Sequence, residues 1–179
     1  MAIRQLGDLK PELDDSAYID DSAQLIGDVK VGADSSVWPL SVIRGDIHSI
    51  RIGNKTNIQD GSVLHVTHDS RFQPGGFALD VGCEVTVGHN VILHGCSIAD
   101  RCLIGMGSTI MDGVTIEAEV MVAAGSLVTP GKSLKSGYLW VGRPARPVRE
   151  LNLEEREYLV YAANHYVKLK NRYKKEHNS

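Results

Sequence analysis

One pattern limits what this chain can fold into: an aliphatic residue returns at every sixth position over most of its length. A period of six fits neither the 3.6-residue turn of an α-helix nor the two-residue alternation of a simple strand. Self-similarity at a short fixed period is typical of solenoids, in which each repeat forms one small structural unit. The repeating positions are Ile19, Leu25, Val31, Val37, Ile43, Ile52, Ile58, Leu64, Val81, Val87, Leu93, Ile98, Ile104, Ile110, Ile116, Val122 and Val128.

Small residues beside the aliphatic ones indicate where the chain bends. Glycine follows the aliphatic position at Gly32, Gly53 and Gly88, and a small or β-branched residue often stands four positions after it, as at Thr56 and Val91. We expect very short strands that each supply one inward side chain, joined by tight turns. Three hexads then close a triangular coil of about 18 residues, stacked on the next at about 4.8 Å. The predicted fold class is mainly β, a parallel β-helix of hexapeptide repeats.

Two insertions interrupt the period. Residues 44–51 add three residues to one step, and residues 66–80 form a longer excursion that contains a Pro-Gly-Gly turn signal. Insertions in solenoids often lie at the binding face. The repeat is expected to end near Val128, and a proline-rich crossing follows at residues 141–147.

A C-terminal α-helix is expected after the crossing. Asn152 and Glu155 have the spacing of a capping box, in which each side chain bonds the other residue's backbone N–H. We therefore predict a β-helix domain over residues 1–148, with an N-terminal lead-in and a proline-rich exit, and a helix over 149–179. The helix should pack on the β-helix or on a neighbouring subunit. Its apolar stripe is Leu159, Ala162, Ala163, Tyr166, Leu169 and Tyr173.

Composition excludes several classes of partner. The 179 residues carry a formal net charge of -3, which gives no basic footprint for nucleic acid or an anionic membrane. No apolar run approaches the roughly 20 residues of a membrane helix, and the N-terminus lacks the pattern of a signal peptide. Cys83, Cys96 and Cys102 form no C-x-x-C pair and are odd in number, which argues against a disulfide framework. We expect a cytoplasmic protein.

Counting hexads around the triangular coil places three residues in one column. Let Leu64 lie on a face called A, with faces B and C following in chain order. His94 then lies one coil above His65, and both directly follow an inward aliphatic residue on face A. Arg44 occupies the same column, one coil below. His65 and His94 are therefore predicted to reach one metal ion within a subunit.

His89 belongs to a different face and cannot easily join that pair. It lies on face C, together with Gln59 and Asp60. A threefold trimer of such prisms would set face A of one subunit against face C of the next. That arrangement would bring His89 of a neighbour to the histidine pair and would place Arg44 opposite Asp60. A monomer is predicted to lack a complete site.

Three neutral imidazoles with an open fourth position form a catalytic zinc site, in which the metal lowers the pKa of bound water to about 7. Zn²⁺ is the expected ion, and Fe²⁺ or Co²⁺ could occupy the same nitrogens. For each histidine the alternative is an outward imidazole that the repeat tolerates without function.

These residues, in order, resemble the motifs of the γ-class carbonic anhydrases. The hexapeptide repeat is similar to the left-handed parallel β-helix shared by that class and by many acyltransferases. The resemblance implies a left-handed coil and a homotrimer with metal at each subunit interface, bound by two histidines of one subunit and one of the next. The matching residues are Arg44-Gly45-Asp46, Asn57-Ile58-Gln59-Asp60, His65, His89 and His94.

The resemblance also implies roles for the residues around the metal. Gln59, held by Asn57, would hydrogen-bond the metal-bound hydroxide. Arg44 with Asp46 and Asp60 would form an ion-pair network at the interface. The reaction would be attack of hydroxide on carbon dioxide, with release of bicarbonate and a proton.

The sequence departs from this family in its proton-transfer residues. Well-studied members carry a glutamate in the excursion and another after the Arg-Gly-Asp, whereas residues 66–80 contain no Glu and Ile47 follows Asp46. Slower hydration, or none measurable, is therefore expected. His68 could replace the missing glutamate as a proton shuttle, although a surface histidine in a loop is the commoner outcome. Tyr161 and Asn164, on the expected helix, could approach the metal.

Two other functions fit the same architecture. A hexapeptide-repeat acyltransferase would have the same prism, trimer and Gly-x-Pro-Ala-Arg exit, but would use a single catalytic histidine as a base. A non-catalytic trimer would use zinc only to hold its subunits together.

Overall fold

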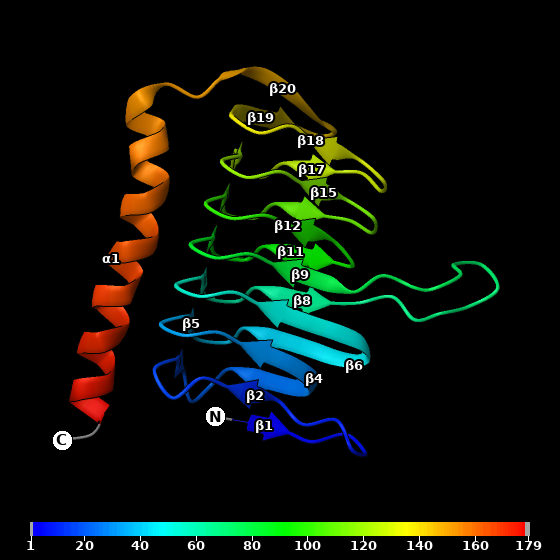
Figure 1. Cartoon of the computed structure of the whole chain (residues 1–179), viewed down its shortest axis with the longest axis vertical. Coiled ribbons are helices and arrows are strands. Elements are labelled where there is room, and N and C mark those ends of the chain that lie inside the picture. Colours follow the sequence, from blue (N-terminus) through cyan, green and yellow to red (C-terminus); the bar gives the residue numbers. More distant parts are fainter. Residues whose placement is uncertain (1, 178–179) are drawn as a thin grey trace.

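The computed structural model, which describes residues 2–177, is a parallel β-solenoid followed by a single long helix (Figure 1). The chain climbs through stacked coils, and each short strand pairs in parallel with the strands one coil above and below. Leu93, for example, is the Cα partner of Leu64 below it and of Ile110 above it. The predicted fold class is confirmed.

The strands form the three faces that the period of six predicts. Face A contains β8 (Val63–His65), β11 (Ile92–His94), β14 (Thr109–Ile110) and β17 (Leu127–Val128). Face B contains β9 (Leu79–Val81), β12 (Ser97–Ile98), β15 (Thr115–Ile116) and β18 (Ser133–Leu134). Face C contains β3 (Tyr18–Ile19), β5 (Ser36–Val37), β7 (Asn57–Ile58), β10 (Thr86–Val87), β13 (Leu103–Ile104), β16 (Met121–Val122) and β19 (Tyr138–Gly142).

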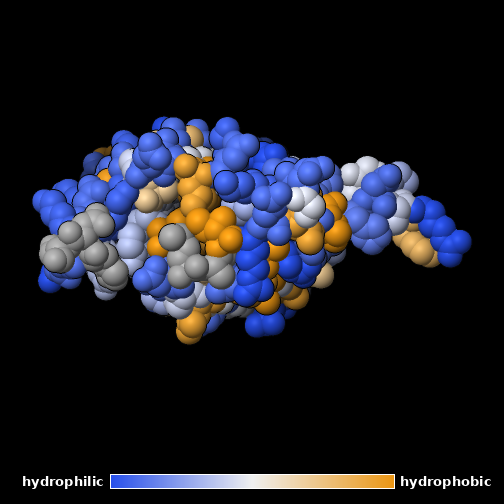
Figure 2. Space-filling view, turned by 90° about the horizontal axis from the view of Figure 1, so that it is seen from below, coloured by the Kyte–Doolittle hydropathy of each residue, from blue (hydrophilic) through white to orange (hydrophobic). Residues whose placement is uncertain are grey.

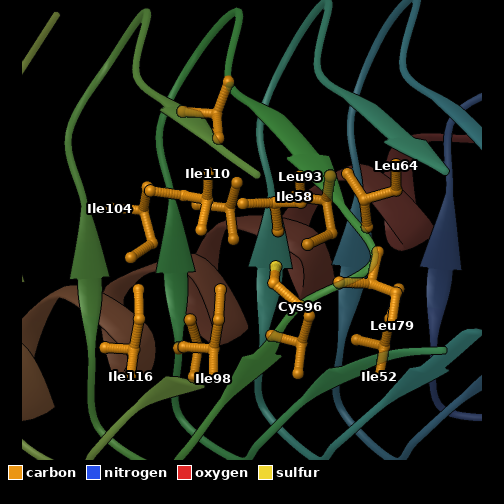
Figure 3. Packing of buried hydrophobic residues seen from close by; sticks show 14 of the residues in the cluster. Ile52, Ile58, Leu64, Leu79, Leu93, Cys96, Ile98, Ile104, Ile110 and Ile116 are labelled. Atoms are coloured by element: carbon orange, nitrogen blue, oxygen red, sulfur yellow. The ribbon is translucent and has the colours of Figure 1, made fainter. Parts of the chain in front are cut away.

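The hydrophobic core fills the inside of the coil. Figure 3 shows the inward aliphatic side chains stacked one above another, coil by coil. Leu64, Leu93, Ile104 and Ile110 are completely buried. Burying one such side chain stabilises the fold by about 1.5–3 kcal/mol. The six-residue period therefore exists because each short strand buries one large side chain in this stack.

The first insertion does not form a loop. Residues 44–51 lie within one continuous strand, β6 (Val42–Ile52), which passes from face A to face B. Strand β4 (Gln24–Val31) makes the same passage below it, and their pairing shifts register between Gly27 and Val29. The extra residues are absorbed in this bend because both ends of β6 stay paired with β4.

The coil extends beyond the repeating aliphatic positions at both ends. Leu134 and the buried Trp140 continue the inward series above Val128, so the expectation that the repeat ends near Val128 was wrong. Strands β1 (Ala2–Arg4) and β2 (Glu12–Leu13) pair with β4 at the bottom. The proline-rich crossing belongs to an antiparallel hairpin of β19 with β20 (Ala145–Glu150).

The second insertion projects from the coil between β8 and β9 as an arm, defined here as residues 66–78 (Figure 1). Isolated antiparallel bridges join Thr67 to Phe77 and Ser70 to Gln73. The side chain of Phe72 near its tip is 81% exposed. Figure 2, which looks at the N-terminal end of the coil, shows the same projection standing clear of the body.

Helix α1 (Leu153–His177) runs back down the outside of the coil and contacts β3, β5 and β10 on face C (Figure 1). The capping box is confirmed: Asn152 Oδ1 accepts from the N–H of Glu155 at 2.8 Å, and Glu155 Oε2 accepts from the N–H of Asn152 at 3.0 Å. Within the described residues, no helix combines the length and apolar character needed to cross a membrane.

Candidate metal centre

The structure brings together two of the three predicted metal ligands. His65 ends β8 and His94 ends β11, and the two residues are direct partners in the parallel register. The Nδ1 atom of His65 lies 3.1 Å from the Nε2 atom of His94. The short coil spacing places these imidazoles side by side, as the hexad count predicts.

Each of these histidines binds an aspartate through its other ring nitrogen. The Nε2 atom of His65 lies 3.0 Å from Asp46 Oδ1, and the Nδ1 atom of His94 lies 2.7 Å from Asp112 Oδ1. Asp46 is also paired with the Arg44 guanidinium. Hydrogen bonds of this kind, from the outer nitrogen to a carboxylate, fix the tautomer and orientation of metal-binding histidines.

Counting protons shows what this chain of contacts requires. Two neutral imidazoles carry two N–H groups, and both are used if His65 donates to Asp46 and His94 donates to Asp112. The two inner nitrogens then face each other at 3.1 Å as lone pairs. Such an arrangement is repulsive unless a metal ion or a third proton lies between them. The contacts therefore suit a metal ion bound by the two inner nitrogens.

The distance between the inner nitrogens also fits zinc. Two nitrogens bound at 2.0–2.1 Å in tetrahedral geometry are separated by about 3.3 Å. The observed distance of 3.1 Å between His65 Nδ1 and His94 Nε2 is shorter than this by only a few tenths of an ångström. Burial lowers the pKa of His65, with Arg44 and His94 acting in the same direction, although Asp46 opposes them. This favours the neutral imidazole, which is the form that binds metal.

His89 lies apart from the pair, on face C. Strand β10 pairs in register with β7, and this places His89 above Asp60, with His89 Nδ1 2.9 Å from Asp60 Oδ2. His89 therefore also gives Nδ1 to an aspartate, and Nε2 is the ring nitrogen that this aspartate does not contact. Over residues 2–177, no cluster of three or more His, Cys, Asp or Glu side chains could hold a metal within one chain.

Gln59 is fixed by a buried polar chain on face C. Its Nε2 donates to Asn57 Oδ1 at 3.0 Å, and Asn57 Nδ2 donates to Thr86 Oγ1 at 3.0 Å. Both amides are buried. Because the Gln59 amide nitrogen is engaged with Asn57, its carbonyl oxygen is the group left for another partner.

A pocket of about 490 Å³ lies between face C and helix α1. Gln59 and His89 line it, together with apolar residues of the coil and the ring of Tyr161 on the helix. Asn164, the other helix residue singled out from the sequence, bonds its own helix through the Val160 carbonyl oxygen at 3.1 Å. His68 is exposed on the arm.

Asp112 was not predicted from the sequence, and no partner for Asp60 within its own chain was predicted either. Asp112 stands one coil above His94, but the five-residue step after Leu93 shifts the register there, so the hexad count gives no reason to select it. Within one chain Asp60 pairs with His89, and Arg44 pairs with Asp46. The predicted contact of Arg44 with Asp60 joins two subunits and stays a prediction.

Comparisons with known proteins agree with this fold. The family described as bacterial transferase hexapeptide (six repeats) matches residues 95–130. Protein YrdA of Escherichia coli is 51% identical over 171 residues, covering 96% of this chain and 93% of YrdA. A crystal structure from Bacillus cereus, provisionally named an acetyltransferase, is 41% identical with a TM-score of 0.91 and covers 97% of each chain.

The chain is also similar to proteins named as gamma carbonic anhydrases. Gamma carbonic anhydrase 2 of Arabidopsis thaliana, a mitochondrial protein, is 42% identical over 164 residues. Gamma carbonic anhydrase 1 of the same plant is 42% identical over 162 residues. The alignment covers 90% of this chain and 58% of the plant protein, which is therefore considerably longer. The chain belongs to the hexapeptide-repeat family of β-solenoids, in the group that includes protein YrdA and the γ-carbonic anhydrases.

Proposed function

We propose that this protein is a γ-class carbonic anhydrase that hydrates carbon dioxide to bicarbonate at metal sites between the subunits of a homotrimer. The observation that carries the proposal is the facing pair of His65 Nδ1 and His94 Nε2, whose outer nitrogens are both bound to aspartates. His89 of the next subunit would supply the third imidazole, because it too is held by an aspartate through one nitrogen.

Zinc held by three neutral imidazoles lowers the pKa of water to about 7 and so supplies hydroxide at neutral pH; iron or cobalt could act similarly. Asp46 and Asp60 hold His65 and His89 in orientation. Gln59, fixed by Asn57, offers its carbonyl oxygen as an acceptor that orients the nucleophile. Arg44 keeps Asp46 in place.

The pocket beside α1 would admit carbon dioxide, since it is lined by apolar residues and reaches both Gln59 and His89. Hydroxide adds to the carbon of carbon dioxide, and bicarbonate leaves. The proton released from water must then reach the solvent. We assign its acceptor to His68 on the exposed arm, in the absence of glutamate there, and expect slow turnover as a result.

Metal analysis and stopped-flow hydration on protein prepared anaerobically with zinc or iron would test this proposal. Wild-type protein should bind metal and hydrate carbon dioxide, and His94→Ala should lose both. His48→Ala is the matched control, because His48 lies on β6 and bonds its neighbour Ser49 instead of the pair. If His94→Ala kept its metal and activity, the site assignment would be wrong.

Acyl transfer is the second candidate, favoured by the Bacillus cereus neighbour and by a crystal structure of the hexapeptide transferase family from Anaplasma phagocytophilum (40% identity, TM-score 0.88, covering 96% of this chain and 98% of that one). Transfer of an acetyl group from acetyl coenzyme A by metal-free protein would establish it. Stoichiometric metal with hydration at background would instead indicate a site that only holds the trimer together.

We also place the proposed enzyme in the cytoplasm, with neither nucleic acid nor membrane as a partner. Its three cysteines are free thiols, as expected of a reducing compartment. Two of them are buried, and burial raises the pKa of Cys102 to about 12. A cysteine with so high a pKa is inert at neutral pH.

A further inference from the structure

Asp112 occupies a position that connects the histidine pair to the arm. It follows β14 in the turn above His94, and its side chain is about one-third exposed. Its Oδ1 atom lies 2.7 Å from His94 Nδ1 and accepts from the Thr67 hydroxyl at 3.0 Å. Thr67 is the second residue of the arm, so a single carboxylate oxygen joins two separate parts of the site.

We propose that Asp112 is a positioning residue that selects the tautomer of His94. By accepting the Nδ1–H of His94, Asp112 leaves Nε2 without a proton and directs it toward His65. A neutral histidine in water prefers the opposite tautomer, with its proton on Nε2. In that tautomer His94 would present an N–H where the proposed metal requires a lone pair.

The base of the arm holds Asp112 in this position. Thr67 is fixed by two backbone hydrogen bonds with Phe77, at 2.9 and 3.0 Å. Phe77 packs against the turns at Gly95 and Gly113, where added Cβ atoms would lie 2.7 and 3.1 Å from its atoms. The arm therefore contacts the turns on either side of Asp112 through Phe77. The Thr67 hydroxyl thus links the position of the arm to Asp112, and Asp112 in turn contacts Nδ1 of His94.

The expected effect on zinc affinity rests on the proposed function. The effect of Asp112 on the His94 tautomer does not, because it can be measured in the metal-free protein. The test uses the full-length protein labelled with ¹⁵N at histidine. Long-range ¹H–¹⁵N correlation spectra of the metal-free form, above the histidine titration range, report which ring nitrogen of His94 carries the proton. Zinc affinity is measured separately by competition with a chromogenic chelator.

Three variants separate positioning from folding. Asp112→Ala removes the acceptor, and Asp112→Asn keeps its shape with a weaker, neutral acceptor. Asp100→Ala is the control, because the Asp100 carboxylate lies in another turn, where it accepts the Cys83 N–H at 2.7 Å. We expect His94 to be protonated on Nδ1 in wild type and in Asp100→Ala, and on Nε2 in Asp112→Ala. Asp112→Asn should give a mixture of the two tautomers.

Loss of this orienting contact should weaken zinc binding about 10- to 100-fold in Asp112→Ala, and less in Asp112→Asn. An Nε2–H tautomer in wild type, or the same tautomer in wild type and both Asp112 variants, would overturn the proposal. Unchanged zinc affinity in Asp112→Ala would overturn it too. If the tautomers shift as expected but wild type binds no metal, the role of Asp112 stands and the proposed function fails.

Discussion

At the residue scale, the three predicted metal ligands share one feature: each gives one ring nitrogen to an aspartate. The pairs are His65 with Asp46, His94 with Asp112 and His89 with Asp60. A histidine that only fills an outward position of the repeat needs no such partner. Three histidines oriented in this way are what the proposed metal site requires.

Gly95 offers a test of the geometry around His94. It has φ +50°, and an added Cβ would overlap Asp112 Oδ1. Gly95→Ala should cost about 1–2 kcal/mol of backbone strain and displace Asp112 from His94. We expect both a lower free energy of unfolding in urea and weaker zinc binding.

Gly107→Ala provides the matched control. Gly107 has φ +67°, but an added Cβ would meet no atom within 4 Å. It should lose a similar free energy of unfolding and bind zinc normally. Equal zinc affinity in the two variants would show that the turn at Gly95 does not position the ligand.

Counting hexads was sufficient to align His65 with His94, because parallel pairing fixes which residues are neighbours one coil apart. Counting could not find Asp112. The five-residue step between Leu93 and Ile98 and the contact with Thr67 of the arm depend on tertiary structure that the period does not encode.

At the scale of elements, polar contacts hold helix α1 to the rest of the chain near both of its ends. Near the C-terminal end the buried Lys170 donates to Ser16 O and Asp34 Oδ1, both at 2.7 Å. Near the N-terminal end Glu155 binds Arg149 and the N–H of Asn152. Between them, Trp38 of face C packs edge-on against Tyr166 of the helix, with ring centroids 5.5 Å apart.

Removing the buried ammonium should loosen the helix. Lys170→Met leaves the Ser16 carbonyl and Asp34 without this donor, and we expect a loss of about 1.5–3 kcal/mol in the free energy of unfolding. Lys174→Met is the control, because Lys174 donates to two backbone carbonyl oxygens of the same segment but lies less deeply buried. If urea denaturation showed the same loss of unfolding free energy in both variants, the burial of Lys170 would not explain its contribution.

The capping box should make stability depend on acid pH. Hydrogen bonds from Arg149 and from the Asn152 N–H lower the pKa of Glu155 from 4.5 to about 2. A carboxyl with a lowered pKa stabilises the fold above its unfolded pKa, and this contribution disappears as pH falls from about 4.5 through 2. Thermal melts should therefore show Glu155→Gln less stable than wild type at pH 7, with the difference vanishing near pH 2. A constant difference across this range would contradict the assignment.

The elements themselves were largely predictable from local chemistry. The helix begins where Asn152 and Glu155 predicted, and the strands lie where the inward aliphatic residues fall. The insertion at residues 44–51 was harder to predict, since β6 remains a strand only because β4 bends beneath it. The pairing of β6 with β4 could not be read from the period of six.

At the scale of the whole molecule, the proposed metal ligands lie on two faces of the prism. His65 and His94 are on face A, whereas His89 and Gln59 are on face C beside helix α1. No rearrangement of side chains within one rigid coil would unite them, so the proposed site needs two subunits. The alignment with gamma carbonic anhydrase 2 of Arabidopsis thaliana covers 90% of this chain's residues.

Mixed trimers test this claim most directly. His89→Ala subunits keep the histidine pair, and His94→Ala subunits keep the donated third ligand. In any trimer that contains both, one interface joins an intact pair to an intact His89. We predict no stoichiometric zinc in either pure variant and a single restored zinc site in each purified mixed trimer. Metal-free mixed trimers beside fully loaded wild type, or a wild-type monomer that holds a full complement of zinc, would contradict the shared site.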